Sequence, residues 1–101
     1  MLEIEEFTQK NLSTLRFSGD LSIAQATQFQ QQLLKFAAKA THIDIKIDNV
    51  ENMDLSFLQL LFSWAKSMKK SEKKLNFEFV LNEEFSRIFD ESGFRQVFEQ
   101  L

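Results

Sequence analysis

The most constraining feature of the sequence is a short run near its middle in which isoleucine alternates with charged residues. Ile43, Ile45 and Ile47 fall at every second position, separated by Asp44 and Lys46. β-branched side chains with a period of two favour a strand. We therefore expect a central strand here, with the rest of the chain supplying its neighbours in the sheet and the helices that cover it.

A first helix is predicted before this strand. Ser22 and Gln25 have the spacing of a capping box, in which a hydroxyl and an amide satisfy two free N–H groups. The apolar residues that follow fall within one arc at 100° per residue, which indicates a helix with one face on a sheet. They are Ile23, Ala26, Phe29, Leu33, Leu34, Phe36, Ala37 and Ala40.

Two more helices are predicted after the strand. The second covers about residues 55–69 and follows Asp54. A single cap of this kind contributes about 1 kcal/mol, which the change Asp54→Ala would remove. The third follows Asn82 and ends before Gly93, where a left-handed helix stop is expected.

The remaining segments complete an α/β domain. Their order is β-β-α-β-α-β-α with an optional final strand, which predicts one domain over residues 1–101. We expect a mixed sheet of four to five strands with helices mainly on one face. The other strands are placed at residues 2–7, 14–17 and 75–81, the turns and loops at 9–11, 18–22 and 48–53, and the optional strand at 94–101.

Composition argues against an enzyme. The chain has no cysteine, one histidine and two glycines, so thiolate sites and a glycine-rich phosphate loop are excluded. His42 is interpreted as a strand-edge residue near solvent rather than a catalytic base. The net charge of −3 also argues against nucleic-acid binding. We expect no cofactor and no metal site.

The N-terminal residues are acidic and no stretch approaches the ~20 apolar residues that span a bilayer. We therefore expect a cytoplasmic protein without membrane insertion. The densest positive charge is the run Lys66, Lys69, Lys70, Lys73 and Lys74. We interpret it as a solvated helix end near the negative pole of the helix dipole, with an anionic partner as the alternative.

The second helix is apolar over a wider arc than contact with a sheet requires. Its apolar side chains cover roughly 200°, whereas ~100° suffices. Leu60 and Trp64 lie toward one margin of this arc. Either the margin is exposed and binds a protein partner, with Trp64 as an anchor, or neighbouring helices cover it.

Ser56 lies in the first turn of the same helix, on its polar stripe. A phosphate at this position would meet free N–H groups and the positive end of the helix dipole, although Asp54 would repel it. The alternative is an ordinary first-turn serine.

Four segments in the same order resemble the STAS family, typified by bacterial anti-sigma-factor antagonists. They are Gly19-Asp20-Leu21, Ile43–Asp48, Met53–Leu58 and Glu91–Phe98. They are similar to the family's Gly-Glu-Leu, its central strand, its Asp-Ser-Ser-Gly-Leu segment and its Ser-Gly-Leu…Phe ending. The resemblance spans about Phe17 to Phe98 and implies a non-enzymatic signalling module that binds a partner protein.

In the STAS family, the residue after the aspartate is the serine or threonine that a partner kinase phosphorylates. That position is Leu55 in this chain, which cannot be phosphorylated. Ser56 aligns with the next small residue, and Phe57 replaces the usual glycine. Either Ser56 has taken over the switch or binding is constitutive, and we favour the second alternative.

The resemblance implies a partner that is a kinase-like anti-sigma factor, a chemotaxis protein or a two-component protein, bound by a monomer or weak dimer. An accessory STAS subunit of an ABC-type lipid transport system is the alternative function. The residues expected to contact the partner are Asp20, Ser22, Asp54, Leu55, Ser56, Leu60 and Trp64.

Overall fold

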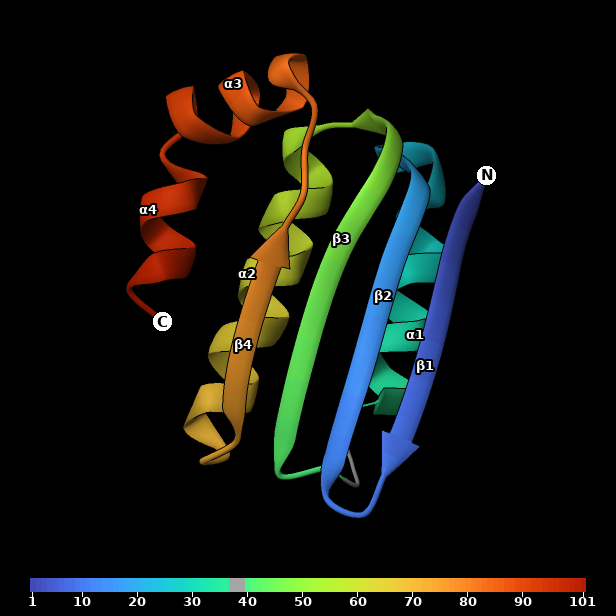
Figure 1. Ribbon diagram of the computed structural model, residues 1–101, viewed down its shortest axis with the longest axis vertical. Coiled ribbons are helices and arrows are strands. Elements are labelled where there is room, and N and C mark those ends of the chain that lie inside the picture. The colour runs from blue at the N-terminus through green and yellow to red at the C-terminus, as the bar shows by residue number, and fades with distance from the viewer. Residues whose placement is uncertain (37–39) are drawn as a thin grey trace.

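The structure is a computed structural model that describes residues 1–36 and 40–101. Strands and helices alternate after an initial hairpin (Figure 1). The strands are β1 (Leu2–Gln9), β2 (Leu12–Leu21), β3 (His42–Met53) and β4 (Lys74–Phe79). The helices are the 3₁₀ turn η1 (Ile23–Gln25), α1 (Ala26–Phe36), α2 (Leu55–Lys70), α3 (Glu83–Glu91) and α4 (Phe94–Glu99). Ala37 of the predicted first helix lies outside the described residues.

The four strands form one mixed sheet in the order β1-β2-β3-β4, which confirms the expected class of fold. β1 pairs with β2 antiparallel, whereas β2, β3 and β4 are parallel. Parallel neighbours need a crossover, and here α1 and α2 provide it. Both helices therefore begin at the end of the sheet where β2 and β3 finish, and both run back toward the opposite end.

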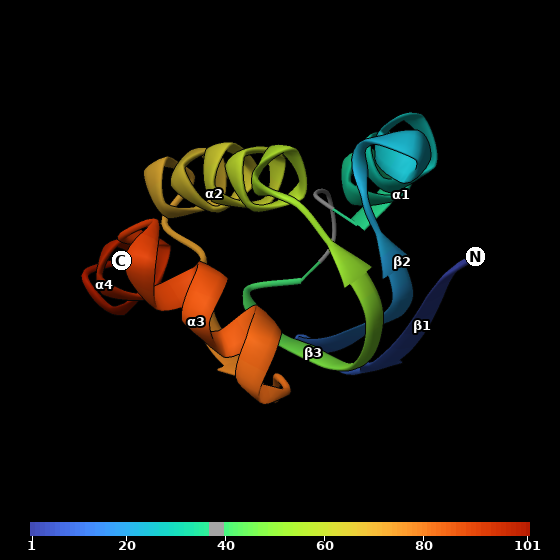
Figure 2. The same cartoon turned by 90° about the horizontal axis from the view of Figure 1, so that it is seen from above.

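The helices are arranged in two groups. α1 and α2 cover one face of the sheet, and α3 and α4 lie beside the β4 edge (Figure 2). The other face carries polar pairs, such as Arg16 Nε with Asp48 Oδ1 at 2.8 Å and Asn76 Nδ2 with Asp44 Oδ1 at 3.0 Å. No helix in the described residues is long and apolar enough to cross a bilayer.

The core lies between the sheet and these helices. Ile43, Ile45 and Ile47 are buried there, as the alternating pattern predicts. Phe29 of α1 contacts Phe17 of β2 with a centroid distance of 5.1 Å and Phe57 of α2 with one of 4.3 Å. Such aromatic pairs contribute about 0.5–1.5 kcal/mol beyond the area they bury. They fix both helices to the same part of the sheet.

The prediction of an optional strand over residues 94–101 is wrong, because residues 94–99 form the helix α4. Its apolar residues Phe94, Val97, Phe98 and Leu101 recur at intervals of three and four, which is a helical period. Phe98 is buried, with its ring centroid 5.2 Å from that of Phe79 in β4 and 5.8 Å from that of Phe62 in α2.

Two predicted loops are also wrong, since residues 18–21 belong to β2 and residues 48–53 belong to β3. The pairing register shifts on both sides of Gly19, so that β3 has two more residues than β2 over this stretch. Gly19 and Asn49 take positive φ values of 85° and 47° at the irregularity. Lys10, rather than Asn11, takes the positive φ in the β1–β2 turn.

Gly19 should tolerate a side chain less well than Gly93, although both have a φ of 85°. A Cβ at Gly19 would overlap the carbonyl oxygen of Met1, which accepts a hydrogen bond from the Asp20 N–H. A Cβ at Gly93 would meet open space. We expect Gly93→Ala to cost about 1–2 kcal/mol for the left-handed backbone alone, and Gly19→Ala to cost clearly more.

Urea unfolding of the two variants measures this difference. Equal losses of unfolding free energy would show that the Met1 carbonyl does not press against Gly19 in solution.

Candidate functional site

The carboxylate of Asp54 joins the starts of two helices. Its Oδ1 accepts a hydrogen bond from the Phe57 N–H at 3.2 Å, which is the predicted cap of α2. Its Oδ2 accepts from the Ile23 N–H at 2.7 Å, at the start of η1 and 31 residues earlier in the chain. The Asp54 N–H itself donates to the carbonyl of Leu21 at 3.2 Å. Asp54 therefore holds the two helix starts at one end of the sheet.

The predicted capping box of Ser22 and Gln25 is absent. Ser22 is the N-cap of η1, but its side chain makes no capping hydrogen bond. Asp54 takes the nearest free N–H, that of Ile23, and the Gln25 N–H donates to the Ser22 carbonyl at 2.9 Å. A carboxylate from a distant segment has replaced the local cap.

Asp20 lies next to this junction near the end of β2. Ser22, through its hydroxyl, is the main cause that lowers the pKa of Asp20; burial acts in the opposite direction, and the N-terminal ammonium group and Asn52 add smaller lowering effects. Oδ1 of Asp20 is shielded from solvent and accepts no hydrogen bond from any described residue. Asp20 as a whole is half-buried at this end of the sheet.

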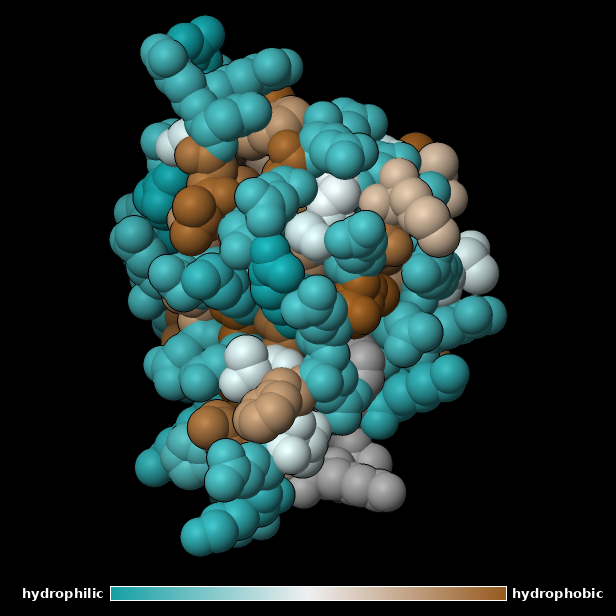
Figure 3. All heavy atoms as spheres, turned by 45° about the vertical axis from the view of Figure 1, so that its right-hand side comes forward, coloured by the Kyte–Doolittle hydropathy of each residue, from teal (hydrophilic) through white to brown (hydrophobic). Residues whose placement is uncertain are grey.

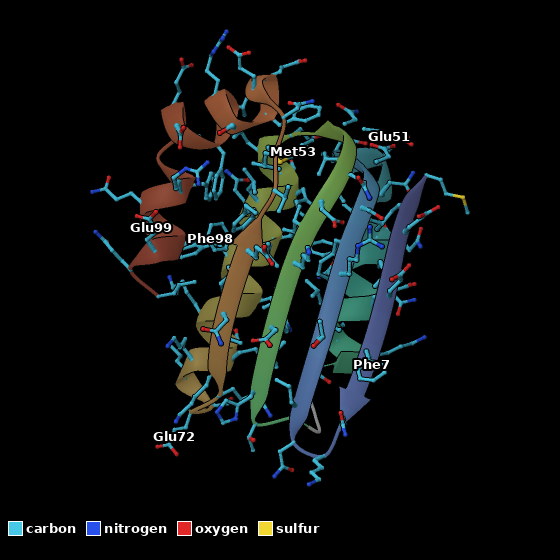
Figure 4. All side chains as sticks on the ribbon, in the orientation of Figure 1. Phe7, Glu51, Met53, Glu72, Phe98 and Glu99 are labelled. Carbon is cyan, nitrogen blue, oxygen red and sulfur yellow. The ribbon has the colours of Figure 1, made fainter. Side chains whose placement is uncertain are left out.

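Leu55 and Ile23 expose apolar surface on the two sides of Asp54. Leu55 is 44% exposed at the start of α2, and Ile23 is 66% exposed at the start of η1. Ser56 is half-buried in the first turn of α2. Figure 4 shows Glu51 and Met53 on the last part of β3, which leads into this junction. The apolar arc of the first helix predicted that Ile23 would lie in the core. That prediction is wrong, because Ile23 is exposed.

Leu60 and Trp64 lie farther along α2. They line a groove of about 240 Å³ between α1 and α2, together with Leu33 and Leu34 of α1. Trp64 is only 8% exposed, so of the two alternatives for this margin the structure shows the second, in which Trp64 is covered. Leu60 is half-buried. Leu34, which the arc also assigned to the core, is exposed.

The structure therefore brings five of the seven predicted contact residues together at one end of the domain, which we call the docking end. They are Asp20, Ser22, Asp54, Leu55 and Ser56. Sequence reasoning missed Ile23, although its place in the first turn after Ser22 was a usable signal. Among the described residues, no three His, Cys, Asp or Glu side chains are grouped to hold a metal ion.

A family model described as "Mlab, STAS domain" matches residues 6–99. Two solved structures have similar folds. The phosphorylated form of the Bacillus cell fate determinant SpoIIAA has a TM-score of 0.67 at 15% identity, with 95% of this chain and 86% of that chain covered. The unphosphorylated form of the anti-sigma factor antagonist SpoIIAA has a TM-score of 0.61 at 14% identity, with 92% and 99% covered. No curated protein sequence matches the chain.

Because Asp54 caps two helix starts, we expect Asp54→Ala to cost about 2 kcal/mol, roughly twice the effect of an ordinary cap. Asn82→Ala is the matched control. The Asn82 side chain caps only α3, where its Oδ1 accepts from the Phe85 N–H at 2.8 Å. Its loss should cost about 1 kcal/mol.

Chemical denaturation of both variants tests the shared cap. If the two substitutions lower the unfolding free energy equally, Asp54 supports only one helix.

Proposed function

The chain belongs to the STAS domain family, and from that premise we propose that it is a non-enzymatic signalling module whose docking end binds a partner protein. The proposal depends mainly on one observation: Leu55 and Ile23 are exposed on either side of a carboxylate that fixes the backbone beneath them. Apolar side chains held on a rigid support lose little conformational freedom when they are buried against a partner.

The polar groups of the docking end add specificity. Asp20 presents a half-buried carboxylate, with the Ser22 hydroxyl beside it. Leaving such a group unsatisfied in an interface is costly, so a partner that donates to Asp20 is selected over one that does not. Leu60 extends the contact along α2 and lines the same groove as Trp64.

We propose that this docking is constitutive. Leu55 occupies the position that resembles the family's phosphorylation site, and its exposed side chain suits a permanent apolar contact. A phosphate on Ser56 would gain the free N–H groups of the first turn of α2 but would lie two residues from the Asp54 carboxylate. One of the similar structures is a phosphorylated form of SpoIIAA, which makes Ser56 the position to examine.

The proposed partner is a signalling protein of the kinase-like anti-sigma, chemotaxis or two-component type, in the cytoplasm. The similar unphosphorylated structure is described as an anti-sigma factor antagonist, which supports this class. An accessory subunit of an ABC-type lipid transport system is the second candidate. The exposed Leu55, at the position that resembles the family's phosphorylation site, favours this second candidate, because a permanent subunit needs no phosphorylation switch.

A charge at Leu55 should prevent partner binding. Leu12→Asp is a matched control, since Leu12 is 42% exposed at the opposite end of the domain. Burying a leucine stabilises a contact by about 1.5–3 kcal/mol, so Leu55→Asp should weaken binding at least tenfold. Affinity capture from cells of the source organism, with quantitative mass spectrometry, should recover one signalling or transport protein with wild type and Leu12→Asp but not with Leu55→Asp. Equal recovery of the same protein with wild type, Leu12→Asp and Leu55→Asp would contradict the proposal that the partner binds at the docking end.

Constitutive docking predicts no phosphorylation of Ser56. The captured partner and ATP are incubated with the wild-type chain and with Ser56→Ala, and intact masses are measured. We expect no mass change in either chain. A gain of one phosphate in wild type that is absent from Ser56→Ala would establish a switch instead.

A further inference from the structure

A second surface lies at the opposite end of the domain, where α1 and α2 finish. Backbone hydrogen bonds join its segments. The carbonyl of Asn11 in the β1–β2 turn accepts from the N–H groups of Thr41 and His42 at 3.1 Å. The carbonyl of Thr41 accepts from the Lys74 N–H at 2.9 Å. The turn and the starts of β3 and β4 therefore form one continuous end, toward which α1 also runs (Figure 1).

This end carries a concentration of positive charge, and we call it the basic end. Its exposed lysines are Lys10, Lys35, Lys69, Lys70 and Lys74. Only one of the chain's fifteen acidic residues, Glu72, lies in the segments 10–12, 34–36, 40–42 and 69–74 that form it. None of the five lysines has a carboxylate within 4.0 Å in the described part of the chain.

Helix dipoles explain only part of this pattern. Lys35, Lys69 and Lys70 lie in the last turns of α1 and α2, where a cation is favoured. Lys10 is in the β1–β2 turn and Lys74 begins β4, so neither follows from a dipole. Lys73 has a structural role, because its Nζ donates to the Ala40 carbonyl at 2.5 Å.

Two exposed apolar side chains flank the β1–β2 turn that carries Lys10. Phe7 is 69% exposed and Leu12 is 42% exposed. Gln9 pairs with Leu12 and Phe7 pairs with Thr14, so Phe7 and Leu12 are diagonal neighbours on the open face of the sheet. Figure 4 shows Phe7 near the β1–β2 turn, and Figure 3 shows hydrophobic atoms among hydrophilic ones toward this end. The packing of the domain does not account for their exposure.

We infer that the basic end binds the surface of an anionic lipid bilayer. Lysines that approach such a surface are attracted by its negative potential, and adjacent phenylalanine and leucine side chains can enter the boundary between headgroups and acyl chains. Nucleic acid would not account for the exposed Leu12, because an aliphatic side chain makes no favourable contact with phosphate groups. Arginine is also the better ligand for paired phosphate contacts. All five cations here are lysines.

The net negative charge of the chain does not oppose this contact. The domain is 36 Å long, whereas charges in 0.15 M salt are screened over about 8 Å. The two carboxylates of the docking end, Asp20 and Asp54, therefore contribute little to the potential at the basic end. Binding is peripheral and leaves the docking end free for a partner.

Sedimentation with lipid vesicles tests the inference on the intact chain. We expect binding to phosphatidylcholine vesicles that contain about one third phosphatidylglycerol, but not to pure phosphatidylcholine, and we expect it to weaken as salt is raised. Each lysine near an anionic surface contributes about fivefold in affinity, so Lys69→Ala with Lys70→Ala should weaken binding about 25-fold. Lys46→Ala with Arg87→Ala removes the same charge elsewhere and should have no effect.

The two leucine variants separate this inference from the proposed function. Leu12→Asp should lose vesicle binding and keep the protein partner, whereas Leu55→Asp should do the reverse. Equal binding to neutral vesicles, or no effect of the Lys69 and Lys70 changes, would overturn the inference. A single-stranded oligonucleotide that binds this end more tightly than the anionic vesicles would also overturn it.

Discussion

The arrangement of this domain depends on one carboxylate that bonds to two helix starts. The first N–H groups of a helix lack partners within the helix, and each must find an acceptor. Asp54 serves Phe57 in α2 and Ile23 in η1 at once, so two crossovers separated by a whole strand are tied at a single point. The exposed side chains of Leu55 and Ile23 take their positions from that bond. Hydrogen bonds from Asp54 to the backbone therefore determine the arrangement of the docking end.

Parallel pairing explains why the two ends of the domain differ chemically. Because β2, β3 and β4 run in the same direction, α1 and α2 must both return in the opposite one. The helix starts and their shared acidic cap, Asp54, gather at one end, and the last turns of α1 and α2 with their lysines gather at the other. Phe29 packs against Phe17 and Phe57 in the core between the sheet and the two helices.

Sequence patterns predicted the features that depend on local periodicity. The isoleucines of β3, the Asp54 cap of α2 and the Asn82 cap of α3 all follow from spacing along the chain. The extensions of β2 and β3 did not, because the irregular pairing near Gly19 and Asn49 interrupts alternation and places polar residues inside strands.

A helical arc likewise gives the direction of a side chain but not the neighbour that it meets. The arc of the second helix therefore left open whether Trp64 is exposed or covered, and Ile23 and Leu34 were expected in the core although they are exposed. The bond from Asp54 to the Ile23 N–H joins residues 31 positions apart, and no local pattern encodes such a contact. Family resemblance supplied the class of function, while the geometry supplied the surface.

The two surplus residues of β3 act as a spacer between the isoleucine pairs and Asp54. Pairing of Ile43, Ile45 and Ile47 with both neighbouring strands fixes one side of this spacer, and Asp54 fixes the other. Deleting one residue would draw Asp54 back by about 3.3 Å and turn its side chain to the other face of the strand. The helix would then have to rotate by about 100° to recover its seating on the sheet. Insertions and deletions in this stretch are therefore far more restricted than those in an ordinary surface loop.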